Sequence, residues 1–181
     1  MVLSLFTGPA NLGAIGLMPS IIPAVCGPQF LFSAWAYKAG WRVPLRMSSL
    51  PAGSLATPAV FVVVEDVVAV DGKGGMEWRR RWGERYRVSV RMRELMWKMT
   101  VFWGLGCLVC VGVACAVCLL AGRYVAFAFG WSWPFIWAGA WAGVTRVWVG
   151  REVRREREEW VAAGGVLEEE EEVEAATAEA V

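Results

Sequence analysis

Residues 100–145 read TVFWGLGCLVCVGVACAVCLLAGRYVAFAFGWSWPFIWAGAWAGVT, and Arg123 is the only charged residue among them. As a helix, the uncharged stretch 100–122 would be about 34 Å long at about 1.5 Å per residue. The hydrocarbon core of a bilayer is about 30 Å thick, so 100–122 and the uncharged stretch 124–145 each have the length of a transmembrane helix. Because almost no chain separates them, they predict a tight helical hairpin in an all-α integral membrane protein.

Basic residues flank this hairpin on both sides and predict its orientation. Cytosolic loops of membrane proteins carry an excess of Lys and Arg, and the tip of the hairpin has only Arg123. We therefore expect a multi-pass protein whose hairpin flanks and C-terminus are cytosolic, although no signal in the sequence identifies the organelle. The flanking bases are Arg79, Arg80, Arg81, Arg85, Arg87, Arg91, Arg93 and Lys98 before the hairpin, and Arg146, Arg151, Arg154, Arg155 and Arg157 after it.

Charge is segregated along the chain, although its net value is only +1. Between residues 73 and 98 there are nine basic and three acidic residues, whereas 166–181 contains seven Glu and no base. We expect a charged cytosolic helix over 146–163, followed by an acidic disordered tail over 164–181, because a run of like charges opposes compact structure. Such a tail predicts a protein partner.

The N-terminal segment 1–37 carries no charged side chain but contains Pro19, Pro23 and Pro28. A proline inside a helix removes one hydrogen bond and clashes with the preceding turn. The pattern predicts a broken or kinked span, or a pair of re-entrant half-helices, within about 12–37. Because a targeting signal would need basic residues, we expect this segment to belong to the mature protein.

The connecting region 38–76 contains a Val-rich stretch, 59–70, that can be interpreted in two ways. Valine favours a strand, and the Asp71–Gly72 pair that follows is typical of a turn. Glu65 and Asp66 lie in its middle, where a charge in lipid is costly. We therefore expect three spans with 38–98 in the cytosol, and four spans remain the alternative.

Residues 77–98 predict a basic amphipathic helix beside the membrane, because aromatic and apolar residues recur at every fourth position. Arginines on its other faces would attract anionic lipid headgroups, and tryptophans would anchor it in the interface. Nucleic acid would attract the same charges, but a helix tethered beside a bilayer meets lipid first, so we expect no nucleic-acid partner. The candidate lipid-binding residues are Arg79, Arg80, Arg81, Arg85, Arg87, Arg91, Trp78 and Trp82.

Small residues follow a regular spacing in both predicted spans and indicate helix-packing faces or homo-oligomer contacts. Small side chains let helix backbones approach closely in lipid. The four cysteines between 107 and 118 are spaced like two metal-binding pairs, but one straight helix cannot direct all four thiolates at one ion, so we expect packing roles. The candidate packing residues are Gly106, Cys110, Ala114, Cys118, Gly139 and Gly143.

Histidine is absent, which removes the commonest general base and metal ligand. We expect no catalytic residue, no metal and no cofactor, and a non-enzymatic function. The favoured interpretation is a membrane scaffold or accessory subunit that contacts anionic lipid through the basic helix and a partner through the acidic tail. The alternative is a small transporter or channel subunit that uses Glu65 and Asp66.

Two segments carry a family resemblance: PAVFVVVEDVVAVDGKGG at 58–75 and MTVFWGLG at 99–106. Together they resemble a group of small, uncharacterised multi-pass membrane proteins of filamentous fungi, over roughly residues 50–125. The resemblance implies a membrane location and implies no activity and no site residue.

Overall fold

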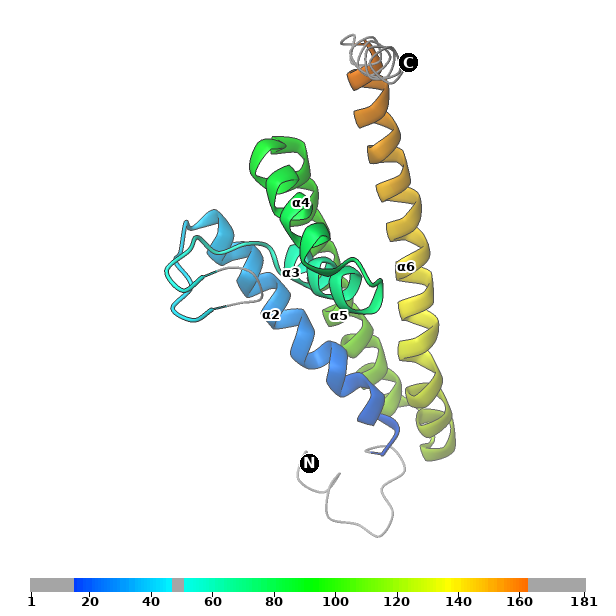
Figure 1. The fold of residues 1–181 in the computed structure, drawn as a ribbon. Coiled ribbons are helices and arrows are strands. Elements are labelled where there is room, and N and C mark those ends of the chain that lie inside the picture. Colours follow the sequence, from blue (N-terminus) through cyan, green and yellow to red (C-terminus); the bar gives the residue numbers. More distant parts are fainter. Residues whose placement is uncertain (1–14, 47–50, 163–181) are drawn as a thin grey trace, which may run out of the picture. The chain divides into compact units, whose positions relative to one another are not determined.

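The computed structural model describes residues 15–46 and 51–162, and the chain is all-α there, as expected (Figure 1). Contacts divide the chain into two compact units, Met1–Ala138 and Gly139–Val181. The predicted acidic tail at 164–181 lies outside the described residues. The elements are η2 (Met18–Ser20), α2 (Ile21–Lys38), α3 (Ala59–Asp66), η3 (Val67–Asp71), α4 (Gly75–Val88), α5 (Val90–Leu120) and α6 (Arg123–Ala162).

Helix α5 is, in the described part of the chain, the one helix long and apolar enough to cross a membrane. It ends at the predicted tight turn, Ala121–Gly122, after which α6 begins. The second predicted span, 124–145, forms the first half of α6, and its Trp, Gly and Ser content makes it less apolar than α5. The charged helix expected at 146–163 is a continuation of α6 to Ala162 rather than a separate element.

The basic stretch forms parts of two helices, so the prediction of one helix over 77–98 was wrong. Ser89 has an extended backbone between α4 and α5, and its hydroxyl accepts a hydrogen bond from the Met92 amide at 3.1 Å. A serine that caps the first turn of a helix in this way defines its start. The remaining basic residues, from Arg91 to Lys98, are therefore continuous with the apolar part of α5.

In its described part, residues 15–37, the N-terminal segment is less broken than its prolines predicted. Pro19 lies in η2 and Pro23 lies in the first turn of α2, where the missing amide would have no helical partner. Only Pro28 lies inside the helix, and α2 continues through it to Lys38. At 18 residues, α2 is about 27 Å long.

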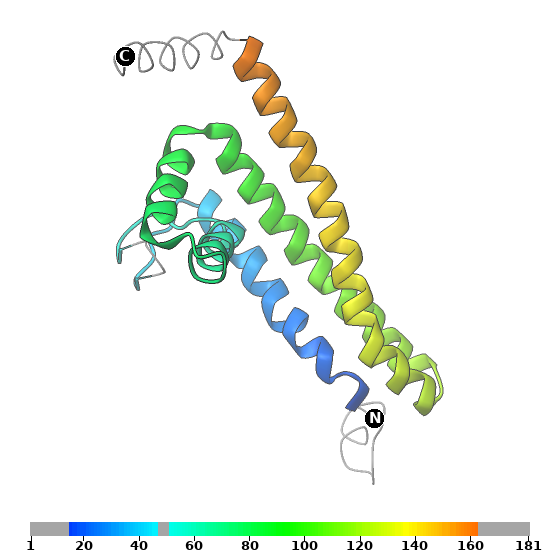
Figure 2. The same ribbon diagram turned by 45° about the vertical axis from the view of Figure 1, so that its right-hand side comes forward.

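Helices α2 and α5 pack side by side through glycine (Figure 2). A Cβ atom added at Gly104 would lie 2.8 Å from the Leu31 side chain and 3.3 Å from the Gly27 carbonyl oxygen. One added at Gly27 would lie 3.0 Å from the Cys107 Cβ. Both glycines are therefore needed for the close approach of these two helices.

The Val-rich stretch is helical, so its strand-like composition was misleading. It forms α3 and then the π-helical turn η3, which the Asp71–Gly72 pair ends. The Val60 amide donates to the Thr100 hydroxyl of α5 at 3.2 Å, and the Ser33 hydroxyl of α2 donates to the Thr57 carbonyl at 3.2 Å. Tertiary contacts of this kind outweigh a residue's β preference.

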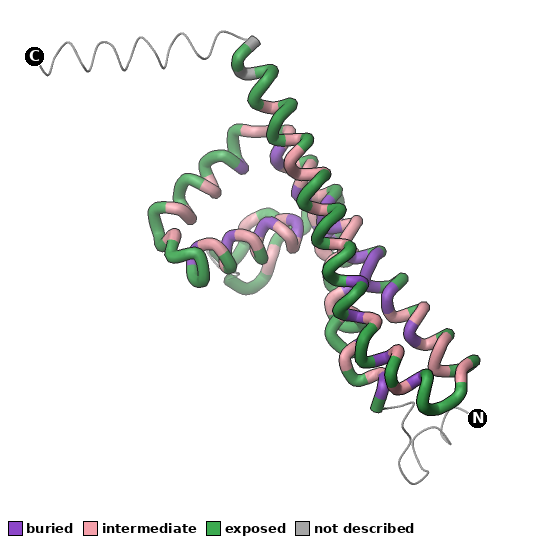
Figure 3. The backbone as a smooth tube through the Cα atoms, turned by 90° about the vertical axis from the view of Figure 1, so that its right-hand side faces the viewer, coloured by how far each residue is buried: buried purple, intermediate pink, exposed green. Residues whose placement is uncertain are grey.

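Buried and exposed positions alternate along the helices (Figure 3).

Candidate functional site

A buried cluster joins α3, α4 and the start of α5. Phe61, Tyr86, Met92 and Met96 form its core, and the Phe61 ring centroid lies 4.3 Å from that of Tyr86. Trp82 stacks on Phe61 at 5.8 Å, and Trp78 stacks on Trp82 at 5.0 Å. The apolar face of α4, which was expected to enter lipid, is therefore engaged in packing within the protein.

Beside this cluster lies the carboxylate of Glu65, which is almost completely buried. Its Oε1 atom is 3.5 Å from Nη1 of Arg79, and Nη2 of the same guanidinium is 2.9 Å from Oδ1 of Asp66. One arginine thus compensates both acids of α3. A buried charge is tolerated in a protein only with such a partner.

The outward face of α4 carries a second, exposed set of charges. Glu77 accepts hydrogen bonds from Arg80 at 3.0 Å and from Arg81 at 2.9 Å, and Arg80 also approaches Glu84 at 3.5 Å. These hydrogen bonds hold the pKa of the Glu77 carboxyl below its usual range, and they raise the pKa of Arg80. Because the arginine side chains are 63% and 73% exposed, such pairs contribute little free energy and exchange readily with other anions.

The six candidate arginines therefore do not form one surface. Arg79 points inward, Arg80 and Arg81 lie outward, and Arg91 belongs to α5 beyond the break at Ser89. Near the end of α4, Nη1 of Arg93 donates to the Arg87 carbonyl at 2.6 Å. A cation at the C-terminus of a helix stabilises its unpaired carbonyls. The remaining candidates, Arg85 and Arg87, are exposed on the last turn of α4.

An aromatic cluster at the end of α2 was not predicted. Phe32, Trp35 and Trp41 are all more than half exposed, and the Trp35 and Trp41 ring centroids lie 5.0 Å apart. Gly40, at φ +67°, lets the chain reverse so that the Trp41 amide bonds to the Ala36 carbonyl at 3.0 Å. Lys38 at the helix end and Gly40 two residues later were the available signal in the sequence for this chain reversal.

Trp97 of α5 contacts the C-terminal end of α2, where this cluster lies. Its indole Nε1 donates to the Ala34 carbonyl at 3.1 Å, and the Lys38 ammonium lies 4.6 Å from its ring centroid. Lys38 follows the uncharged segment 1–37, and Lys98 precedes the uncharged segment 100–122. The two lysines therefore lie at the same end of the α2–α5 pair.

The predicted small-residue stripe is only partly assembled. Gly106, Cys110 and Ala114 are buried on α5, and Cys118 is half-buried. The Trp133 indole of α6 donates to the Cys110 carbonyl at 3.0 Å, so this stripe faces the part of α6 that belongs to the first unit. Gly139 and Gly143 are exposed in the second unit, with open space around each, so their packing role stays a prediction.

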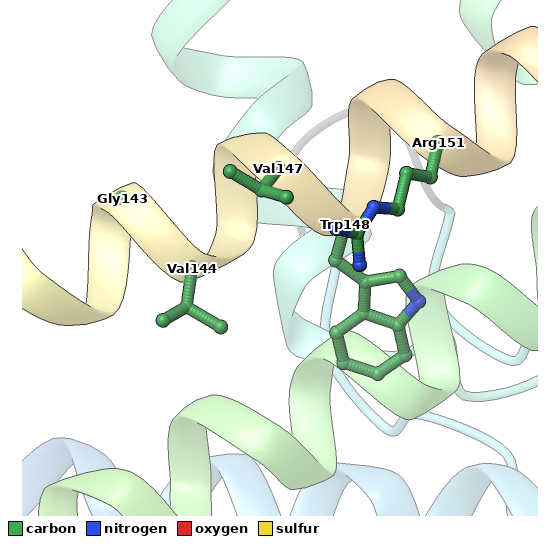
Figure 4. Close-up of a pocket in the computed structure, with 5 residues that line it drawn as sticks. All are labelled: Gly143, Val144, Val147, Trp148 and Arg151. Carbon is green, nitrogen blue, oxygen red and sulfur yellow. The ribbon is translucent and has the colours of Figure 1, made fainter.

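A shallow hollow lies on α6 within the second unit (Figure 4). Gly143, Val144, Val147, Trp148 and Arg151 line it, and all five belong to this one helix. Its walls are mainly apolar, and Arg151 supplies the only charge among them. A hollow of this kind offers packing surface rather than a set of reacting groups.

The comparisons with known proteins give a family but no activity. The family described as Domain of unknown function (DUF8766) matches residues 14–160, which includes every described helix except the last two residues of α6. No curated protein and no solved structure matches the chain. The family description names neither a location nor a source, so the resemblance to fungal membrane proteins stays a prediction.

Proposed function

The chain belongs to the DUF8766 family, and we propose that it is a non-enzymatic, multi-pass membrane protein that acts as a scaffold or accessory subunit. In this proposal α2, α5 and the 124–145 part of α6 cross the bilayer. Helices α3 and α4, together with the first two turns of α5, form a cytosolic cap. The exposed arginines of α4 contact anionic lipid, and the acidic tail at 164–181 binds a partner.

The membrane part of the proposal rests on length and on exposed apolar surface. Helix α5 has the length and composition of a span. Ile22 and Val25 of α2 and Leu105 and Val109 of α5 are each more than half exposed. A soluble protein rarely leaves a large contiguous apolar surface in water, whereas lipid covers it without cost. The basic flanks support a cytosolic cap.

The observation that carries the choice of a scaffold is the contact of Arg79 with both Glu65 and Asp66. A transporter that used these carboxylates would need them to reach an ion or a proton along a water-filled path. Here one arginine engages both acids beside the packed aromatic cluster. A structural role for Glu65 and Asp66 is therefore better supported than a transport role.

The lipid contact is tested with the double variant Arg80→Gln, Arg81→Gln in the full chain. Native mass spectrometry of protein released from phosphatidylserine-containing nanodiscs counts the anionic lipids that stay bound. We expect fewer bound phosphatidylserine molecules with the double variant than with the wild-type chain. The matched control is Arg123→Gln, at the opposite end of α5, which should leave the count unchanged. Equal retention by the double variant and the wild-type chain would remove the lipid contact from the proposal.

The partner contact of the acidic tail is tested separately. Deletion of 166–181 removes seven Glu residues without touching the described helices. We expect the shortened chain to reach the membrane as the full chain does but to lose co-purifying proteins. An unchanged set of co-purifying proteins would contradict a role of the tail in partner binding.

A further inference from the structure

The segment formed by α3 and η3 has one apolar face whose side chains are about half exposed or more. Val63, Val67 and Val70 are 46%, 50% and 67% exposed, and their spacing puts them on one side of the helix. Phe61 and Glu65, which lie on the other side, are buried against the cap. We call these three valines the valine face.

The start of α3 lies near the end of the uncharged part of α2 and the beginning of the uncharged part of α5. The Val60 amide is bonded to Thr100, the first residue of the uncharged stretch of α5. The residue that precedes α3 by two positions, Thr57, is bonded to Ser33 of α2. Ser33 lies five residues, or about 7.5 Å, inside the helix end at Lys38. If the bilayer covers the uncharged segments, α3 therefore begins at its boundary.

Length and charge exclude a crossing by this segment. Residues 59–71 extend about 20 Å as a helix, whereas a span needs about 20 residues. Asp66 and Asp71 also lie in this stretch. The carboxylate of Glu65 is turned away from the valine face and toward Arg79 in the cap. The Asp66 side chain is 48% exposed, and Asp71 is exposed as well. The segment thus has one side buried against the cap, which carries Glu65, and an opposite apolar side, which is the pattern of a helix that lies in a membrane interface.

We propose that α3 and η3 form an interfacial helix whose valine face contacts the hydrocarbon edge of the cytosolic leaflet. This inference rests on the proposed membrane location. Lipid is the favoured occupant because α3 begins near the ends of the uncharged segments and its exposed apolar side chains are valines. In this arrangement Arg79 compensates the two carboxylates of a helix that rests on lipid. A bilayer contact would also hold the cap at a fixed height above the membrane.

The test measures the depth of a spin label in liposomes that contain the full chain with its five cysteines replaced by alanine. The label is attached through Val67→Cys, with Val109→Cys on the proposed span and Glu84→Cys on the outer face of α4 as references. Collision with oxygen reports hydrocarbon, and collision with a water-soluble nickel chelate reports water. We expect Val67→Cys to resemble Val109→Cys, with oxygen collisions dominant, and Glu84→Cys to show the reverse.

Each other outcome overturns a different claim. If Val67→Cys resembles Glu84→Cys while Val109→Cys reports hydrocarbon, the interfacial helix is refuted and the membrane span stands. If Val109→Cys itself reports water, the proposed span fails, and the interfacial helix fails with it. Low collision rates with both reagents at Val67→Cys would mean that protein covers the valine face, which refutes lipid as its occupant.

A second measurement avoids the removal of the cysteines. Benzoylphenylalanine is placed at position 67 of the otherwise unchanged chain, and the liposomes are irradiated. We expect phospholipid adducts of this residue in the mass spectrum, at a level comparable to the same probe at position 109. Adducts to a second polypeptide in place of lipid would refute the proposal even where the cysteine-free chain fails to fold.

Discussion

The contact of Arg79 with Glu65 leads to a quantitative prediction for the variant Arg79→Ala. The Glu65 side chain is 1% exposed, so removal of its partner leaves a buried carboxylate without compensation. Breaking a buried pair in this way costs about 3–5 kcal/mol. The 3.5 Å separation and the 18% exposure of Arg79 favour the lower end, about 3 kcal/mol. For a chain of this size that loss lowers the melting temperature by about 6–12 °C.

The assay is thermal unfolding in detergent micelles, followed by far-ultraviolet circular dichroism. The matched control is Arg80→Ala, which removes an exposed arginine from the same helix and should lower the melting temperature much less than Arg79→Ala does. A double-mutant cycle combines Arg79→Ala with Glu65→Gln. In the Glu65→Gln background, Arg79→Ala should lower the unfolding free energy much less, because the buried carboxylate is gone. An Arg79→Ala variant as stable as Arg80→Ala, or one equally destabilised in the Glu65→Gln background, would refute the reasoning.

Three further predictions concern packing and pH. In α5, Gly104→Val should lower the unfolding free energy by about 1–3 kcal/mol through overpacking. Gly112→Val, where open space surrounds the position, should cost much less, and equal thermal stability of the two variants would contradict the α2–α5 contact. Trp133→Phe should lower the unfolding free energy by about 1 kcal/mol, because it removes the hydrogen bond to the Cys110 carbonyl. An unchanged melting temperature would show that this bond does not form. Burial raises the pKa of Tyr86, so the folded state holds the phenol proton more tightly than the unfolded chain does. Its contribution to stability is fully present below the usual phenol pKa of about 10 and falls by up to about 1.4 kcal/mol per pH unit above it. Tyr86→Phe should flatten this alkaline loss in melting curves recorded between pH 9 and 11, and an equally steep loss would argue against a buried phenol.

Features with a local cause could be predicted from the sequence. The uncharged stretches 100–122 and 124–145, with almost no chain between them, predicted a tight turn, and the structure has one between α5 and α6. The buried positions Gly106, Cys110 and Ala114 follow the predicted four-residue spacing. Both features depend on residues that are close in the sequence, so the distribution of charges indicates the turn and the periodicity indicates the buried positions.

Features that join distant segments could not be predicted in this way. Glu65 and Arg79 are 14 residues apart in two different helices, and no periodicity indicates that one guanidinium serves two acids of α3. The close approach of Gly27 and Gly104 has the same character. Such contacts depend on how helices pack, and packing is decided by the whole assembly of side chains.

The basic stretch shows how one residue can redirect a correct pattern. The four-residue spacing of Trp78, Trp82 and Tyr86 was real, but Phe61 of α3 covers that face. Ser89 then ends the helix, because a serine hydroxyl competes for the backbone amides that a continuous helix would use. The amphipathic pattern therefore indicated a face that is buried within the protein. The pattern alone did not show that this face contacts lipid.

The central claim is that α5 and α6 form a membrane hairpin with both flanks on one side. The direct test introduces one further cysteine at a time, Lys73→Cys, Arg123→Cys or Arg151→Cys, and labels it with a membrane-impermeant maleimide in sealed microsomes. The unsubstituted chain, which keeps its five cysteines, gives the background labelling to be subtracted. We predict that positions 73 and 151 react in intact microsomes and that position 123 reacts only after the membrane is opened with detergent. Reaction at position 123 in intact microsomes, or protection at either flank, would contradict the hairpin.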